Sequence, residues 1–216
     1  MIDILLNFLP EKSNFINLFS YLTTRTILAT LTGLMMVLFL GETFIKRIRS
    51  LQFQQSIGDR GPDSHKIKDG TPTMGGLLII GSVILSGFLW GDLTNKYLLI
   101  SIFCLLTFAL IGFVDDYNKI KQKNQEGMSG ISKIFWQFIC ACIISVVLYA
   151  TAENKSEISY IVPFFKEVVL DFGVWFIFIS IFIIIGSSNA VNLTDGLDGL
   201  AILPVIIITA ALGVIA

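Results

Sequence analysis

Six apolar runs, each long enough to cross a lipid bilayer, constrain this chain more than any other feature of its sequence. A helix of about 20 apolar residues spans the hydrocarbon core, and only helices or closed barrels satisfy their own backbone groups there. We therefore expect an all-α, polytopic integral membrane protein that forms a single transmembrane domain over residues 1–216. The expected spans are residues 26–45, 73–91, 97–114, 134–150, 172–188 and 200–216.

The overall composition supports this class. Hydrophobic residues make up 54% of the chain and charged residues 14%, whereas roughly a quarter of residues are charged in soluble domains. The net charge of −1 comes from charges that cluster between the apolar runs, so nothing favours binding to nucleic acid. Cys104, Cys140 and Cys142 all lie inside apolar runs, where we expect them to pack as small hydrophobic side chains.

Lysine and arginine counts in the connecting segments predict the orientation, because such residues accumulate on the cytoplasmic side. Segment 46–72 holds six lysines and arginines, and segment 115–133 holds four. The two connecting segments expected on the opposite side of the membrane hold only one and two. We therefore expect the N-terminus outside. Segments 46–72, 115–133 and 189–199 are then expected on one cytoplasmic face.

Two adjacent carboxylates, Asp115 and Asp116, follow the third expected span directly. They repel one another and oppose the dipole of a helix C-terminus, so a purely structural role is disfavoured. A solvated helix end is the simpler alternative. The pair is more typical of a site in which cations compensate the charges.

The stretch "NAVNLTDGLDGLA", residues 189–201, places further oxygen-bearing side chains behind an apolar run. Asn192, Asp195 and Asp198 follow one another at intervals of three residues, so on a helix they would occupy an arc of roughly 120°. Helix capping explains one of these residues but not all three. Carboxylate and amide oxygens suit Mg2+ and, through it, a phosphate.

The stretch "GPDSHKIKDGTPTMGG", residues 61–76, supplies the opposite charge. Lys66, Lys68 and Thr73 lie among glycines whose backbone N–H groups are open to an anion. An ordinary basic loop that enters a helix at Pro72 is the alternative. A lone loop histidine, His65, is expected to be a surface residue.

These two stretches and "GFVDDYNKIK", residues 112–121, closely resemble the signature loops of the phospho-N-acetylmuramoyl-pentapeptide transferases. That family is a branch of the polyprenyl-phosphate N-acetylhexosamine-1-phosphate transferases, and the three motifs occur in order along the chain. The resemblance implies that Asp115, Asp116 and Asp198 are catalytic. It also implies substrate-binding roles for Lys68, Thr73, Lys119, Lys133, Asn192 and Asp195, with Asn192 as a candidate metal ligand.

The reaction implied by the resemblance moves phospho-N-acetylmuramoyl-pentapeptide from UDP to undecaprenyl phosphate. UMP is released and lipid I is formed, which is the first membrane step of bacterial peptidoglycan synthesis, with consequences for cell shape and division. The implied cofactor is Mg2+, and the implied location is the bacterial inner membrane among its lipids. A homodimer is an assembly compatible with this interpretation. The chemistry is compatible with direct attack by the lipid phosphate and with an aspartyl-phosphate intermediate on Asp115 or Asp116.

Members of that family continue with further spans and cytoplasmic motifs, one of which supplies an acidic magnesium ligand. We therefore expect the transferase domain to be incomplete at its C-terminal end. Three alternatives remain: an inactive truncated membrane fragment, a sibling transferase that uses UDP-N-acetylglucosamine, and a cation or proton transporter. The clustering of acids in loops on one face disfavours the transporter, whose carboxylates usually lie near the membrane midplane.

Overall fold

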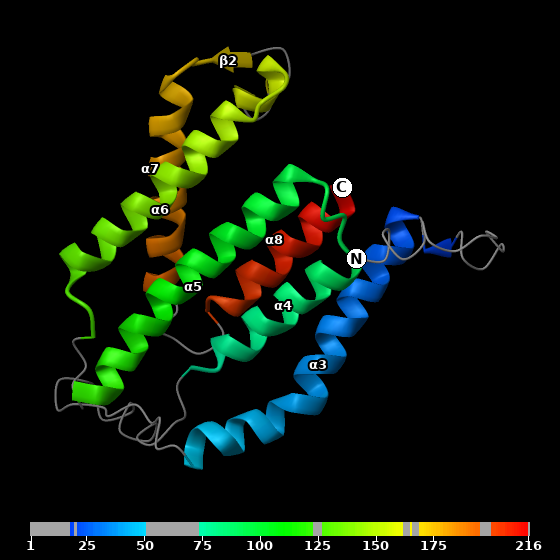
Figure 1. Cartoon of the computed structure of the whole chain (residues 1–216), viewed down its shortest axis with the longest axis vertical. Coiled ribbons are helices and arrows are strands. Elements are labelled where there is room, and N and C mark those ends of the chain that lie inside the picture. The colour runs from blue at the N-terminus through cyan, green and yellow to red at the C-terminus, as the bar shows by residue number, and fades with distance from the viewer. Residues whose placement is uncertain are drawn as a thin grey trace. The chain divides into compact units, whose positions relative to one another are not determined.

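The computed structural model describes residues 18–19, 21–50, 74–122, 127–161, 165, 169–194 and 200–215 (Figure 1). Each of the expected apolar spans coincides with an α-helix. In chain order these helices are α3 (Leu22–Ser50), α4 (Gly76–Trp90), α5 (Lys96–Gln122), α6 (Gly130–Ala150), α7 (Trp175–Thr194) and α8 (Ile202–Ile215).

Four of these helices, namely α3, α5, α6 and α7, are long and apolar enough to cross a membrane. Helices α4 and α8 are equally apolar in character but have only 15 and 14 residues. Large apolar side chains on the long helices are exposed, including Phe39 at 75% and Phe182 at 78%, as expected for surfaces that face lipid. The expectation of a mainly helical polytopic membrane protein is confirmed, whereas six crossings and an external N-terminus stay predictions.

Several helices extend beyond the apolar runs that predicted them. Helix α3 continues to Ser50, with an ion pair between Lys46 and Glu42 one turn apart. Helix α5 continues through the acid pair to Gln122, and α7 continues through the asparagines to Thr194. Parts of the segments expected to be loops are therefore helical. Hydropathy marks where a helix leaves the apolar layer, and the backbone hydrogen bonds continue until a turn interrupts them.

The chain divides into two compact units, Met1–Trp136 and Gln137–Ala216. In the first unit, α4 packs against both α3 and α5. The indole N–H of Trp90 donates a hydrogen bond to the Thr32 hydroxyl at 2.9 Å, and Gly33 allows close approach to Ser86. Small residues and an interhelical hydrogen bond are what hold neighbouring helices together where lipid removes the hydrophobic driving force.

A short turn at residues 91–95 joins α4 to α5. The Asp92 carboxylate accepts hydrogen bonds from the Thr94 hydroxyl at 2.6 Å and from the Thr94 N–H at 2.9 Å. These two bonds lower the pKa of Asp92, because they stabilise its charged form. The turn is thus fixed by its own side chains.

In the second unit, α6 and α7 run antiparallel and are joined through a small hairpin. Tyr149 contacts Phe176 at one end of the pair, and Gln137 contacts Asn189 at the other. A 3-10 helix, η2 (Lys155–Ile158), leads into strands β1 (Ser159–Ile161) and β2 (Val169–Asp171). The strands pair antiparallel with Tyr160 opposite Leu170. The sequence does not predict these strands, because each has three residues and shows no alternation long enough to detect.

Candidate active site

The acid pair lies on α5, past its apolar portion, and the two side chains have different surroundings. Asp115 is almost completely enclosed, with 8% of the residue exposed. The side chain of Asp116 is 36% exposed, compared with 11% for that of Asp115. Neighbouring residues on a helix point about 100° apart, which explains why one carboxylate is covered and the next is open.

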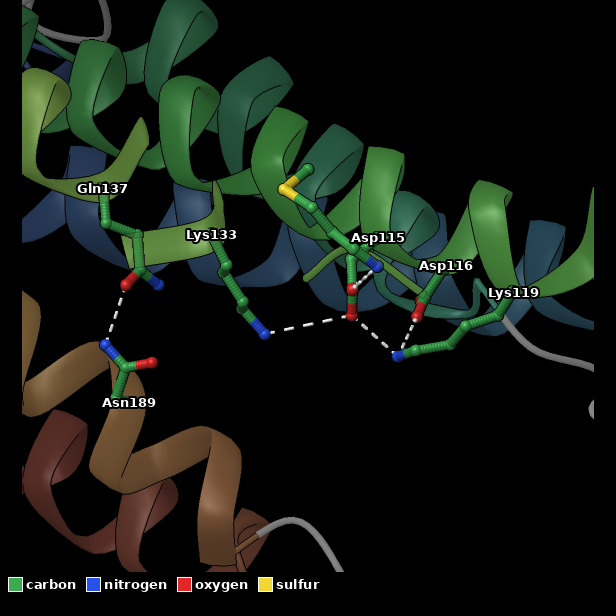
Figure 2. A network of polar contacts seen from close by, with 7 residues as sticks. Asp115, Asp116, Lys119, Lys133, Gln137 and Asn189 are labelled. Atoms are coloured by element: carbon green, nitrogen blue, oxygen red, sulfur yellow. Dashed lines mark hydrogen bonds and ion pairs between the residues drawn. The ribbon is translucent and has the colours of Figure 1, made fainter. Parts of the chain in front are cut away.

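Two lysines compensate these carboxylates (Figure 2). The Lys119 ammonium lies 2.7 Å from Oδ2 of Asp115 and 3.2 Å from Oδ1 of Asp116. The Lys133 ammonium, which comes from the first turn of α6, lies 3.9 Å from the same Oδ2 of Asp115. Two carboxylates and two ammonium groups therefore form one connected network.

A turn that precedes α6 completes the surroundings of Asp115. The backbone N–H of Met128 donates a hydrogen bond to Oδ1 of Asp115 at 2.8 Å. Gly127, immediately before it, has a φ of +48°, in the left-handed region that favours glycine. The turn brings main chain, rather than a side chain, against the carboxylate.

Such a network can bind anions and cations at once. Lysine ammonium groups attract phosphate oxygens, and a partly exposed carboxylate is a hard oxygen ligand. Among the described residues, no group of three histidine, cysteine, aspartate or glutamate side chains is arranged to hold a metal alone. The donor set still fits Mg2+, which is commonly held by one or two carboxylates together with substrate phosphates.

The C-terminal half of α7 carries the asparagines singled out in the sequence. Asn189 donates from Nδ2 to Oε1 of Gln137 at 2.8 Å (Figure 2). The same nitrogen donates to the Ile185 carbonyl at 2.9 Å. Asn192 lies exposed in the last turn of α7. Asn189 therefore anchors the helix, while Asn192 is open to a ligand.

The structure describes Asp115, Asp116, Lys119, Lys133 and Asn192 among the predicted site residues. The first four of them form one network. Lys68, Thr73, Asp195 and Asp198 lie outside the described residues, as does His65.

Sequence reasoning missed three residues of these contacts and one strained residue elsewhere in the chain. Gly127 forms the turn, Met128 donates its backbone N–H, and Gln137 supplies a buried amide. None of these contributions has a sequence motif. Met74, two residues before α4 begins at Gly76, has a φ of +68° although it is not glycine. A non-glycine residue in this region is strained, and such strain gathers at functional segments.

One known protein family and one family signature match parts of the chain. Residues 98–216 match the family described as Glycosyl transferase family 4, a stretch that begins in α5 and extends to the end of the chain. Residues 68–80 match the phospho-N-acetylmuramoyl-pentapeptide-transferase signature 1. The first match contains the whole acid–lysine network, and the second contains Lys68, Thr73 and the strained Met74.

Proposed function

This chain belongs to glycosyl transferase family 4, and from that premise we propose that it transfers phospho-N-acetylmuramoyl-pentapeptide from UDP to undecaprenyl phosphate. UMP leaves and lipid I is formed. The observation that carries the proposal is the acid–lysine network beyond the apolar part of α5, in a chain that also contains the matching signature at residues 68–80.

The location of the network suits two anionic substrates, one of which has a long apolar tail. Helix α5 is apolar along most of its length and carries Asp115, Asp116 and Lys119 in its last two turns. A polyprenyl chain can lie in the bilayer beside such a helix while its phosphate reaches the charged end. The proposal places this end on the cytoplasmic side of a bacterial inner membrane, where nucleotide sugars are found.

The proposed chemistry needs neutralisation of charge more than strong base catalysis. A phosphate monoester has a second pKa near 6, so the lipid phosphate is already mostly a dianion at neutral pH. One of its oxygens attacks the phosphorus attached to the sugar. The bond from that phosphorus to the oxygen of UMP breaks, and UMP carries away the electron pair.

Three residues of the network, Lys119, Lys133 and Asp116, have proposed tasks in the reaction. Lys119 and Lys133 offset the negative charge of the two approaching phosphates. The open carboxylate of Asp116 orients the attacking phosphate or accepts its residual proton. Bound Mg2+ would supply further neutralisation of the diphosphate, and the Asp116 carboxylate offers it an oxygen ligand. A metal-binding role for Asn192 rests on the family resemblance.

Four residues outside the described part of the chain complete the proposal. We assign nucleotide-sugar binding to Lys68, Thr73 and Asp195, and a catalytic role to Asp198. These roles rest on the family and the signature match. The reaction itself is compatible with a monomer or a homodimer.

The test is release of UMP by membranes that contain the protein, supplied with undecaprenyl phosphate, Mg2+ and UDP-N-acetylmuramoyl-pentapeptide. We expect release to require all three additions and to yield a lipid-linked product. A parallel reaction with UDP-N-acetylglucosamine tests whether the protein instead has the specificity of the sibling transferases, which use that sugar nucleotide. Release with that sugar alone would assign the protein to the sibling branch, and no release with either sugar would contradict transferase activity.

A further inference from the structure

Both oxygens of the Asp115 carboxylate are already engaged by the protein. Oδ1 accepts the hydrogen bond from the Met128 N–H at 2.8 Å. Oδ2 lies 2.7 Å from the Lys119 ammonium and 3.9 Å from that of Lys133. Since the residue is also only 8% exposed, a ligand could reach Asp115 only by displacing one of these groups.

Asp116 has the opposite character. Its Oδ1 shares Lys119 at 3.2 Å, and no described residue donates a hydrogen bond to its Oδ2. More than three times as much of its side chain is exposed, 36% against 11%. Within the described part of the chain, Asp116 is therefore the member of the pair with an open oxygen.

Gly127 makes this asymmetry possible. A Cβ atom at Gly127 would lie 2.6 Å from Oδ1 of Asp115 and 2.8 Å from Cε of Lys119. Real contacts of a Cβ atom are longer than this, so a side chain at this position would force the turn, the Asp115 carboxylate or the Lys119 side chain to move and would disturb their contact. The φ of +48° independently favours glycine at the same position.

We infer that the turn at Gly127–Met128 is a latch that fixes Asp115 as the enclosed anchor of the acid pair and leaves Asp116 as the carboxylate that meets substrate or cation. Gly127 is then a positioning residue that acts through Asp115. The part of this inference that concerns catalysis rests on the proposed function, whereas the geometry of the latch does not.

The first experiment needs no activity. The protein in membranes is treated with a carbodiimide and glycine ethyl ester, and labelling of each carboxyl group is followed by tandem mass spectrometry. We expect Asp116 to react several-fold faster than Asp115 in the parent protein. Equal rates for the two residues, or a faster rate for Asp115, would overturn the latch.

The second experiment uses Gly127→Ala with Gly130→Ala as its matched control. A Cβ atom at Gly130 meets nothing within 4 Å, and this glycine begins α6 only three residues later. We expect Gly127→Ala to raise the labelling rate of Asp115 toward that of Asp116, while Gly130→Ala leaves both rates unchanged. Unchanged labelling in Gly127→Ala would contradict a role of Gly127 in enclosing Asp115.

A third variant, Gly127→Asn, separates backbone conformation from contact. Asparagine tolerates left-handed φ values better than alanine but carries the same Cβ atom. If the contact between Cβ and Asp115 is what exposes the carboxylate, the labelling rate of Asp115 should rise in Gly127→Asn as it does in Gly127→Ala. Recovery of parental labelling in Gly127→Asn would show that only the φ value matters and that the contact does not.

The catalytic part is tested by UMP release from the same membranes. Gly127→Ala should lower turnover about 10- to 100-fold, the range that small displacements in an active site produce. Added to Asp115→Ala, it should cause no further loss, because a residue that acts through Asp115 has no separate effect once the carboxylate is gone. Additive losses would overturn the positioning role. If the labelling results hold but no variant and no parent releases UMP, the proposed function fails while the latch stands.

Discussion

Gln137 accepts a hydrogen bond at 2.8 Å from the side-chain amide of Asn189, and this contact joins α6 to α7 near the C-terminal end of α7. Gln137 is only 2% exposed, so its oxygen has lost water and depends on this partner. Asn192 lies one turn beyond Asn189, and the chain then leads into Asp195 and Asp198. The contact therefore fixes the helix from which these predicted site residues emerge.

We predict that Gln137→Met and Asn189→Leu each destabilise the pairing of α6 with α7. Hydrogen bonds between membrane helices contribute about 0.5–2 kcal/mol, so the loss in unfolding free energy should fall in that range. Unfolding in mixed micelles of lipid and SDS measures it. The double variant should be less destabilised than the sum of the two, and strict additivity would show that the bond contributes nothing.

The role of Lys119 can be separated from the general effect of positive charge on topology. Lys119 contacts both acids, whereas Lys121, two residues later on α5, makes no ion pair with a described residue. Lys119→Met should reduce UMP release about 100-fold or more, as expected for loss of one charge-stabilising contact in such a site. Lys121→Met should stay close to the parent. Equal losses at equal abundance would assign both lysines to topology.

The orientation of the chain gives a prediction about side-specific labelling. Cysteines introduced at positions 64, 122 and 194, in a protein whose three native cysteines are replaced by serine, should react only with reagents that reach the cytoplasm. The reason is the accumulation of ten lysines and arginines in segments 46–72 and 115–133. Reaction of any of the three with an impermeant reagent added to intact cells would contradict a shared cytoplasmic face.

The hairpin between α6 and α7 gives a prediction about stability. The Tyr160 hydroxyl and the Ser180 hydroxyl lie 2.9 Å apart, and the Tyr160 ring contacts Phe172 and Phe176. Tyr160→Phe keeps the ring contacts and removes the hydrogen bond, so it should cost about 0.5–1.5 kcal/mol of unfolding free energy. Tyr160→Ala should cost more, because the ring contacts are lost as well. Equal stability of Tyr160→Phe and the parent would show that the hydroxyl pair is not stabilising.

The helices were predictable because hydropathy alone identifies segments that must satisfy their backbone in lipid. The hairpin was not, since three-residue strands depend on pairing and on contacts such as Tyr160 with Phe176.

The site likewise contains contacts that the local sequence predicts and contacts that only the tertiary structure creates. Asp115, Asp116 and Lys119 are close in sequence on one helix and could be grouped beforehand, at i, i+1 and i+4.

The remaining contacts of the site depend on tertiary structure. Met128 contributes only its backbone N–H, and a backbone group has no signature in the sequence. Gln137 resembles any polar residue within an apolar helix until α7 brings Asn189 against it. Lys133 was reached through family resemblance, because nothing in its local sequence connects it with Asp115.

The last prediction distinguishes a catalytic Asp198 from a helix cap. Asp198 lies outside the described residues, four positions before α8 begins at Ile202, so capping of a helix start is the competing explanation. Asparagine caps a helix about as well as aspartate does, whereas it cannot supply the negative charge. Asp198→Asn should therefore lower UMP release about 100- to 1000-fold, equivalent to about 3–4 kcal/mol, if the residue acts on the reacting groups. The abundance of the variant in the membrane should match that of the parent, because folding does not need the charge. Turnover within about twofold of the parent at equal abundance would be the behaviour of a cap and would remove Asp198 from the proposed site.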